Sequence, residues 1–325
     1  MNPQRIAPLA GALLLCTFLV FVQEVSAQDV AEGSFTRNLK VSGPVNLQVR
    51  AGSGSITVRR GSSGEVQVMA RIRANRGLFS TGDPAERVRA VENNPPIEQN
   101  GSSIRIGFVQ DNDIYRNISI SYEILTPAQT ELSARSGSGS VSVEGIQGTV
   151  DAHTGSGSIR ILDVDRDVRT SAGSGAIELD GLRNSVTART GSGPIRATHL
   201  GRLSAVSGAT NEQPTARLDL QTGSGSIRLN DIVGSLRAST GSGSIHAAGE
   251  PEGSWHLRTG SGGVILDLPQ NSGFDLVART GSGGIRVDHP LTTEGRMEKN
   301  SVRGTVRGGG ASLDIHTGSG GIRIQ

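Results

Sequence analysis

The chain has 325 residues, of which 32 are basic and 30 acidic, with a formal net charge of +2. This near balance argues against a nucleic-acid-binding protein, which needs a strongly basic surface. The single cysteine, Cys16, lies in a predicted signal segment, so the mature chain is expected to have neither a disulfide nor a thiol nucleophile.

Residues 1–27 have the form of a secretory signal peptide. Arg5 is followed by an apolar run over residues 6–22 and by Val25-Ser-Ala27, a small-residue cleavage site. We expect cleavage after Ala27; the alternative is an uncleaved membrane anchor, because the run is near the shortest length that spans a bilayer. The segment predicts an exported protein, located in the periplasm, at the outer surface or outside the cell.

Residues 28–130 are predicted to form a less regular β region. Apolar and polar residues alternate at 45–49, 55–58 and 66–72, and again at 104–106 and 118–122. This alternation is typical of strands with one buried face. Residues 75–100 interrupt it with a loop and a short helix, because Asp83 suits a helix cap and Pro84 suits the first helical position.

Residues 131–325 are dominated by a repeat. The tripeptide Gly-Ser-Gly occurs ten times in the chain, and from residue 137 onward most copies are 18 to 21 residues apart. The copies begin at Gly52, Gly137, Gly155, Gly173, Gly191, Gly223, Gly241, Gly260, Gly281 and Gly318. A fixed period of this size indicates stacked copies of one structural unit.

Each unit has one alternating segment before Gly-Ser-Gly and one after it, as in Val150-Asp-Ala-His-Thr154 and Ile159-Arg-Ile161. One such unit cannot bury its apolar side alone, whereas a stack can. The predicted internal ladders are Ile159, Ile177 and Ile195, and Val150, Val168 and Val186. The sequence therefore predicts an all-β fold, a parallel β-solenoid with coils of about 18 residues. A right-handed single-stranded β-helix is expected, since parallel crossovers take that hand.

The glycines of the repeat are interpreted as corners whose backbone angles are closed to other residues. Two stretches, residues 207–217 and 288–311, do not follow the repeat. We expect both to be loops that project from a coil.

A family resemblance rests on residues 45–49, 54–58 and 65–68, on the stretch Tyr122-Glu-Ile-Leu-Thr-Pro127 and on the repeated Thr-Gly-Ser-Gly-Ser-Ile. In these segments the chain resembles the bacterial DUF4097 family. The resemblance covers most of residues 35–325. It implies a β-solenoid at the cell envelope or surface, for which the label adhesin is used. It carries over no catalytic residue.

The outward positions of the repeat carry mainly basic residues. If the coils stack in register, these residues form two columns with neighbours about 4.8 Å apart. The candidate binding residues are Arg160, Arg196, Arg228, Arg286 and Arg323 after the turn, and Arg189, Arg258 and Arg279 before it. The columns suit an anionic polymer such as acidic polysaccharide or lipopolysaccharide phosphate. The alternative is a solvated face that protects the sheet, with Asp151, Asp219, Asp275 and Asp314 offsetting its charge.

The sequence offers no candidate catalytic residue, metal site or cofactor site. Asp163-Val-Asp-Arg-Asp167 has the alternate carboxylates of a calcium loop but lacks the glycine and glutamate that complete one. The six histidines show no metal-ligand spacing. The serines recur in every corner, whereas a nucleophile is expected once, on a nucleophile elbow.

The favoured hypothesis is an exported, non-enzymatic adhesin-like or scaffold protein that presents a repetitive β surface to an anionic envelope polysaccharide or another envelope protein. The alternative is a polysaccharide-active lyase or hydrolase on a β-helix fold, which needs carboxylates that converge in a cleft. The chain stops at residue 325 directly after a strand and without a polar cap, so we expect this end to be in contact with something, because solenoids normally cover an open edge. Such an edge predicts end-to-end self-association, a partner or a covering loop.

Overall fold

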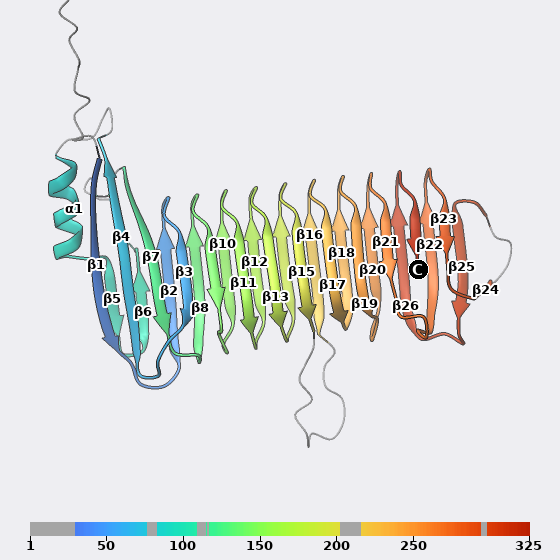
Figure 1. The fold of residues 1–325 in the computed structure, drawn as a ribbon, viewed down its shortest axis with the longest axis horizontal. Helices are drawn as coiled ribbons and strands as arrows, with labels where there is room; N and C mark the ends of the chain where they lie inside the picture. Colours follow the sequence, from blue (N-terminus) through green and yellow to red (C-terminus); the bar gives the residue numbers. More distant parts are fainter. Residues whose placement is uncertain (1–29, 77–82, 109–114, 116, 202–215, 294–297) are drawn as a thin grey trace, which may run out of the picture.

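The computed structural model describes residues 30–76, 83–108, 115, 117–201, 216–293 and 298–325. The predicted signal peptide and nearly all of the loop expected at 207–217 lie outside these residues. The described chain forms a long rod of stacked strands, with helix α1 (Pro84–Asn93) at one end (Figure 1).

One face of the rod, called sheet A, has 13 strands among the described residues. In spatial order they are β1 (Val30–Lys40), β4 (Glu65–Asn75), β7 (Ile118–Thr126), β3 (Ile56–Arg60), β9 (Val141–Glu144), β11 (Ile159–Val164), β13 (Ile177–Leu182), β15 (Ile195–Leu200), β17 (Ile227–Val233), β19 (Ile245–Glu250), β21 (Val264–Asp267), β27 (Ile322–Ile324) and β23 (Ile285–Val287).

The other face, called sheet B, has 14 strands in the same part of the chain. In spatial order they are β5 (Ile97–Asn100), β6 (Ser103–Ile106), β2 (Val45–Ala51), β8 (Thr130–Ser136), β10 (Val150–Thr154), β12 (Val168–Ala172), β14 (Val186–Thr190), β16 (Arg217–Thr222), β18 (Ser235–Thr240), β20 (Trp255–Thr259), β26 (Ala311–Thr317), β22 (Phe274–Thr280), β25 (Ser301–Val306) and β24 (Leu291–Thr293).

Each interior coil consists of a strand of sheet B, a Gly-Ser-Gly turn and a strand of sheet A. For example, β10 leads through Gly155-Ser-Gly157 into β11, and β12 begins the next coil. The strands of successive coils pair in parallel, with the same register from coil to coil. The predicted β-solenoid is therefore confirmed.

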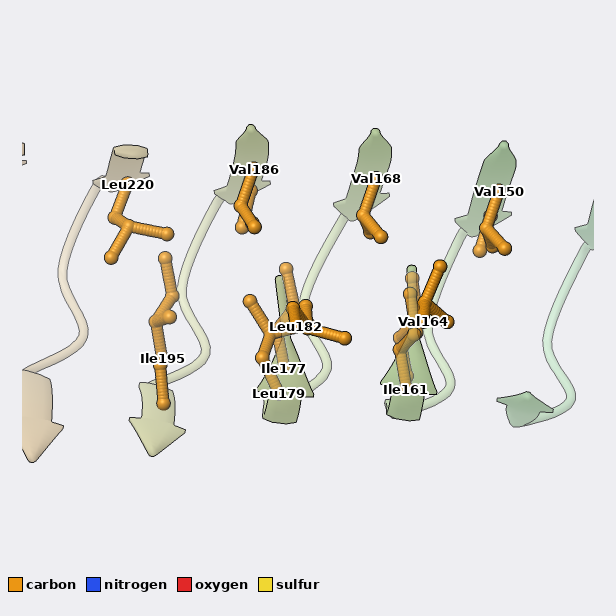
Figure 2. Packing of buried hydrophobic residues seen from close by; sticks show 14 of the residues in the cluster. Val150, Ile161, Val164, Val168, Ile177, Leu179, Leu182, Val186, Ile195 and Leu220 are labelled. Atoms are coloured by element: carbon orange, nitrogen blue, oxygen red, sulfur yellow. The ribbon is translucent and has the colours of Figure 1, made fainter. Parts of the chain in front are cut away.

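Aliphatic side chains fill the space between the two sheets in the ladders predicted from the sequence. The ladders are Ile159, Ile177 and Ile195 in sheet A and Val150, Val168 and Val186 in sheet B. These side chains are 0–2 % exposed. Figure 2 shows valines of one sheet facing isoleucines and leucines of the other across this interior. Close packing of the ladders makes each coil depend on its neighbours for burial.

The threonine before most Gly-Ser-Gly turns joins two coils. Thr190 Oγ1 donates a hydrogen bond to the carbonyl of Gly175 in the preceding coil (3.0 Å) and accepts one from the amide of Gly193 in its own turn (3.2 Å). Both bonds recur at four other threonines, which are Thr154, Thr222, Thr240 and Thr259. The threonine, although polar, is therefore buried with its hydroxyl satisfied.

The interpretation of the Gly-Ser-Gly glycines as corners with special backbone angles is wrong. None of these glycines has a positive φ. Instead, a Cβ on Gly155 or Gly193 would overlap a carbonyl oxygen of the turn beneath it. Glycine is needed because the stacked turns approach one another closely, which leaves no room for a side chain.

The N-terminal end of the rod is closed by antiparallel strands and by α1. The helix has the predicted cap, because Asp83 Oδ1 accepts a hydrogen bond from the amide of Ala85. Glu92, near the end of α1, accepts a hydrogen bond from the backbone amide of Ser34 in β1 (2.8 Å). The helix therefore covers part of the open edge of sheet A. No helix among the described residues has the length and apolar character to cross a membrane.

At the C-terminal end the chain leaves its sequential order. The last coil, β26 and β27, lies between the coil of β20 and β21 and the coil of β22 and β23. The chain end marked C in Figure 1 accordingly lies inside the stack, with β25 beyond it. The strand β27 has a neighbour on each side, β21 and β23, so the contacts expected at this end are made with strands of the same chain.

The expected loop over residues 288–311 is also partly wrong. Residues 291–293 and 301–306 form β24 and β25, and β25 pairs antiparallel with β22. The alternation in this stretch places Val302 and Val306 in the core. These strands extend sheet B past β22, whereas sheet A ends at β23.

Candidate functional site

The outward positions of sheet A form one column along the rod. From β9 to β23 its members are Ser142, Arg160, Glu178, Arg196, Arg228, His246, Ile265, Arg323 and Arg286. All five arginines predicted for this column lie in it. Arg323 precedes Arg286 because the last coil is inserted before β23.

Most of the arginines in the sheet A column form no ion pair among the described residues, although Glu178 lies in register between Arg160 and Arg196. Within the described residues, Arg160, Arg196, Arg228 and Arg323 form no ion pair with a carboxylate. Arg286 differs, because its Nε lies 2.8 Å from Asp288 Oδ1. That hydrogen bond, together with the charge of Asp288, raises the pKa of Arg286 above its ordinary value.

Two of the unpaired arginines are direct neighbours. Arg196 on β15 and Arg228 on β17 are register partners in adjacent parallel strands. Both side chains are exposed. Like charges placed opposite each other in a sheet destabilise it slightly, and a bound anion between them would remove that repulsion. Among the described residues of sheet A, this pair is therefore the position that most favours the binding of an anion.

The matching column of sheet B has its charge largely compensated. It contains the predicted Arg189, Arg258 and Arg279, in register with Arg135, His153, Ser171, Gln221, Ser239 and His316. A neighbouring column carries aspartates that pair with three of its arginines. The pairs are Arg135–Asp151 at 3.6 Å, Arg189–Asp219 at 3.5 Å and Arg258–Asp314 at 3.7 Å. Such exposed pairs each contribute about 0–1 kcal/mol to the stability of the fold. Their negative charges nevertheless offset the positive charge of the three arginines.

A family model described as Toastrack DUF4097 matches residues 44–325. The chain belongs to the DUF4097 family.

Two solved structures are similar to this DUF4097 chain. One is described as "a putative cell adhesion protein" from Clostridium sporogenes, with 11 % identity, 90 % of this chain and 99 % of that chain covered, and a TM-score of 0.24. The other is described as "a putative adhesin" from Bacteroides fragilis, with 12 % identity, 90 % and 97 % covered, and a TM-score of 0.41. A search of curated proteins found no match.

The described residues of this DUF4097 protein place the other candidate groups at corners. Asp163 has φ 51° near the end of β11, and Asp165, directly after this strand, pairs with Arg183 at 2.8 Å. Across the described part of the chain, no three His, Cys, Asp or Glu side chains are grouped to hold a metal ion. The carboxylates of the suspected calcium loop therefore act in turns and ion pairs.

Sequence reasoning did not separate the two columns by their charge balance. In sheet B, Asp219 and Asp314 each occupy the outward position two before that of the column, on β16 and β26. In sheet A, Arg196 and Arg228 are followed two residues later by Thr198 and Asn230, but other column positions are followed by Asp180, Asp267 and Asp288. A comparison of outward neighbours in the sequence therefore does not distinguish the two columns.

Proposed function

We propose that this protein is an exported, non-enzymatic, adhesin-like component of the bacterial cell envelope that binds an anionic envelope polymer along the outer face of sheet A. The observation that carries the proposal is the column Arg160, Arg196, Arg228 and Arg323, whose guanidinium groups form no ion pair among the described residues, although Glu178 lies in register between the first two. A regular rod holds these guanidinium groups at fixed spacing, so a polymer gains several contacts for little ordering of the protein.

The length of the stack supports binding of an extended ligand. Parallel pairing sets neighbouring coils about 4.8 Å apart, so charges recur along the rod instead of converging at one point. Guanidinium groups bind carboxylate and phosphate with charge-assisted hydrogen bonds. An acidic polysaccharide or a phosphate-bearing polymer supplies such groups in series.

The test compares the two sheets. The protein is applied to immobilised polygalacturonate and to immobilised polyphosphate at low and high salt. We expect the triple variant Arg160→Gln, Arg196→Gln and Arg228→Gln to elute at clearly lower salt, because exposed charge contacts are screened by ions. The matched control neutralises Arg135, Arg189 and Arg258 of sheet B, and we expect it to elute near the unmodified protein. Equal loss in both triple variants would contradict the proposal, as would retention unchanged by the sheet A variant.

A further inference from the structure

The outer face of sheet B has a hollow that is separate from both arginine columns. Its volume is about 850 Å³, within the usual range for sites that bind small molecules. It extends over β14, β16, β18 and β20. The lining side chains that face outward are Ser185, Arg217, Asp219, Ser235, Arg237, Ser254 and His256.

Small residues form the floor of this hollow. Ser185, Arg217, Ser235 and Ser254 occupy equivalent positions in four successive coils. The three serines leave space that larger side chains would fill, and their hydroxyl groups both donate and accept hydrogen bonds. A ligand in the hollow therefore meets several hydroxyl groups on a rigid sheet.

Two guanidinium groups border the hollow. Arg217 lies on β16 and Arg237 on β18, and neither side chain has an ion pair within the described residues. The one carboxylate of the lining, Asp219, already pairs with Arg189 and accepts a hydrogen bond from Gln221 (2.9 Å). The free positive charge of the hollow thus exceeds its free negative charge.

We infer that this hollow binds an acidic sugar unit, with Arg217 and Arg237 holding its carboxylate and the serines and His256 bonding its hydroxyl groups. Charge-assisted contacts to a carboxylate and a dense set of hydroxyl partners are the two features that such a ligand needs. The lining contains no aromatic side chain. Affinity therefore depends on the carboxylate, and a neutral sugar of the same size binds poorly. This site stands on its own, because none of its residues belongs to the sheet A column.

The test uses trigalacturonate as the probe, with uncharged maltotriose for comparison, and titration calorimetry with the whole protein. We expect trigalacturonate to bind and maltotriose not to bind. The double variant Arg217→Gln and Arg237→Gln is expected to weaken binding at least tenfold. The variant Ser235→Leu fills the floor, and we expect a similar loss without loss of charge.

The matched control is Arg89→Gln with Arg303→Gln, which removes the same charge at two exposed positions outside the hollow and outside both arginine columns. We expect it to bind trigalacturonate as the unmodified protein does, whatever it does to polymer retention. The inference is overturned if the unmodified protein does not bind trigalacturonate, if the Arg217 and Arg237 variant binds unchanged, or if both double variants weaken binding equally. Circular dichroism of each variant verifies that the rod is intact.

Discussion

The interior coils and the coils at the two ends are built from the same kinds of strand but are held differently. An interior coil has an equivalent coil above and below it, so its turn glycines stack on an equivalent turn and its threonine bonds the turn of the preceding coil. At each end the chain departs from sequential order. The coil of β2 and β3 lies between that of β6 and β7 and that of β8 and β9, just as β26 and β27 are inserted near the other end.

This difference shows how a repetitive stack stops growing. A parallel coil always leaves an open edge for one more copy of itself. Here antiparallel strands β1, β4 and β5 lie beyond the first coils, and β25 and β24 lie beyond the last coil in sheet B. Sheet A ends at β23, a parallel strand of three residues. Any end-to-end self-association is therefore a proposal about β23 and no longer about the last strand.

Removal of the inserted coil is the most severe test of this comparison. In the stack, β22 pairs only with β25 and β26 among described strands, so deletion of residues 311–325 separates the last parallel coil from the rod. We expect residues 269–310 to lose protection from proteases, while the stack up to β21 stays resistant. Limited proteolysis with mass spectrometry measures the boundary.

The outcome that would contradict this expectation is continued protection of the last parallel coil after the deletion. The coil of β22 could dock directly on that of β20, since its threonine and glycine positions match. That docking would bring Leu276 next to Trp255, two core residues that Leu313 now separates. If residues 274–287 remain protected in the truncated chain, the repeats are interchangeable and the inserted coil is not needed for the end of the rod.

Alanine at a turn glycine separates interior from end positions. In Gly193→Ala the new Cβ would overlap the carbonyl of Gly175, so the turns must move apart at a cost of about 2–3 kcal/mol. Gly52 opens the first Gly-Ser-Gly copy, and its Cβ would meet nothing within 4 Å. We expect Gly52→Ala to change stability by less than about 0.5 kcal/mol. Denaturant unfolding of the two variants measures the contrast, and similar losses would refute close stacking as the reason for glycine.

The threonine between coils is tested by a reciprocal pair of variants. Thr190→Ala removes the hydroxyl that bonds Gly175 and Gly193, and we expect it to destabilise the protein by about 1–2 kcal/mol. Ala172 occupies the same column in the preceding coil, where the threonine is missing. Ala172→Thr is expected to add the two bonds and to stabilise by up to about 1 kcal/mol. Thermal unfolding measures the stability of both variants. A destabilised Ala172→Thr variant would show that this position lacks room for the threonine side chain and its two hydrogen bonds.

The regular part of this fold was predictable because its signals are local and repeated. Alternation around Gly-Ser-Gly fixed which side chains point inward, so Ile159 and Val150 could be placed in ladders before any coordinates. The inserted coil was not predictable in this way. The step from Gly260 to Gly281 is 21 residues, close to one ordinary coil, although β22 sits two positions beyond β20 in sheet B. In the observed arrangement Leu313 lies in register between Trp255 and Leu276, and that order of coils is a tertiary effect.

The candidate site was predictable in composition but not in charge balance. Outward arginines follow from the alternation, and their columns follow from the register. Whether Arg189 forms an ion pair with Asp219 depends on the conformations of two long side chains on strands of different coils. The hollow with Arg217 and Arg237 depends on three serines that come together only when four coils are stacked. A sequence interpreted one coil at a time does not show either feature.

The smallest expected effect concerns one interior position that breaks the inward pattern. Thr170 lies on β12 between Ala152 and Ala188, and it is 3 % exposed. Unlike the threonines before the turns, its Oγ1 has no hydrogen-bond partner in the part of the chain that the structure describes. Thr170→Val keeps the shape and removes the unsatisfied hydroxyl, so we expect a gain of about 1 kcal/mol, seen as a higher unfolding midpoint. Thr154→Val is the control and is expected to be destabilising, because that hydroxyl bonds Gly139 and Gly157. Thr154 lies within hydrogen-bond distance of a stacked turn, whereas Thr170 does not. Changes of opposite sign in the free energy of unfolding of the two variants would show that threonine stabilises a coil through its bonds to the turn and not through its position in a strand.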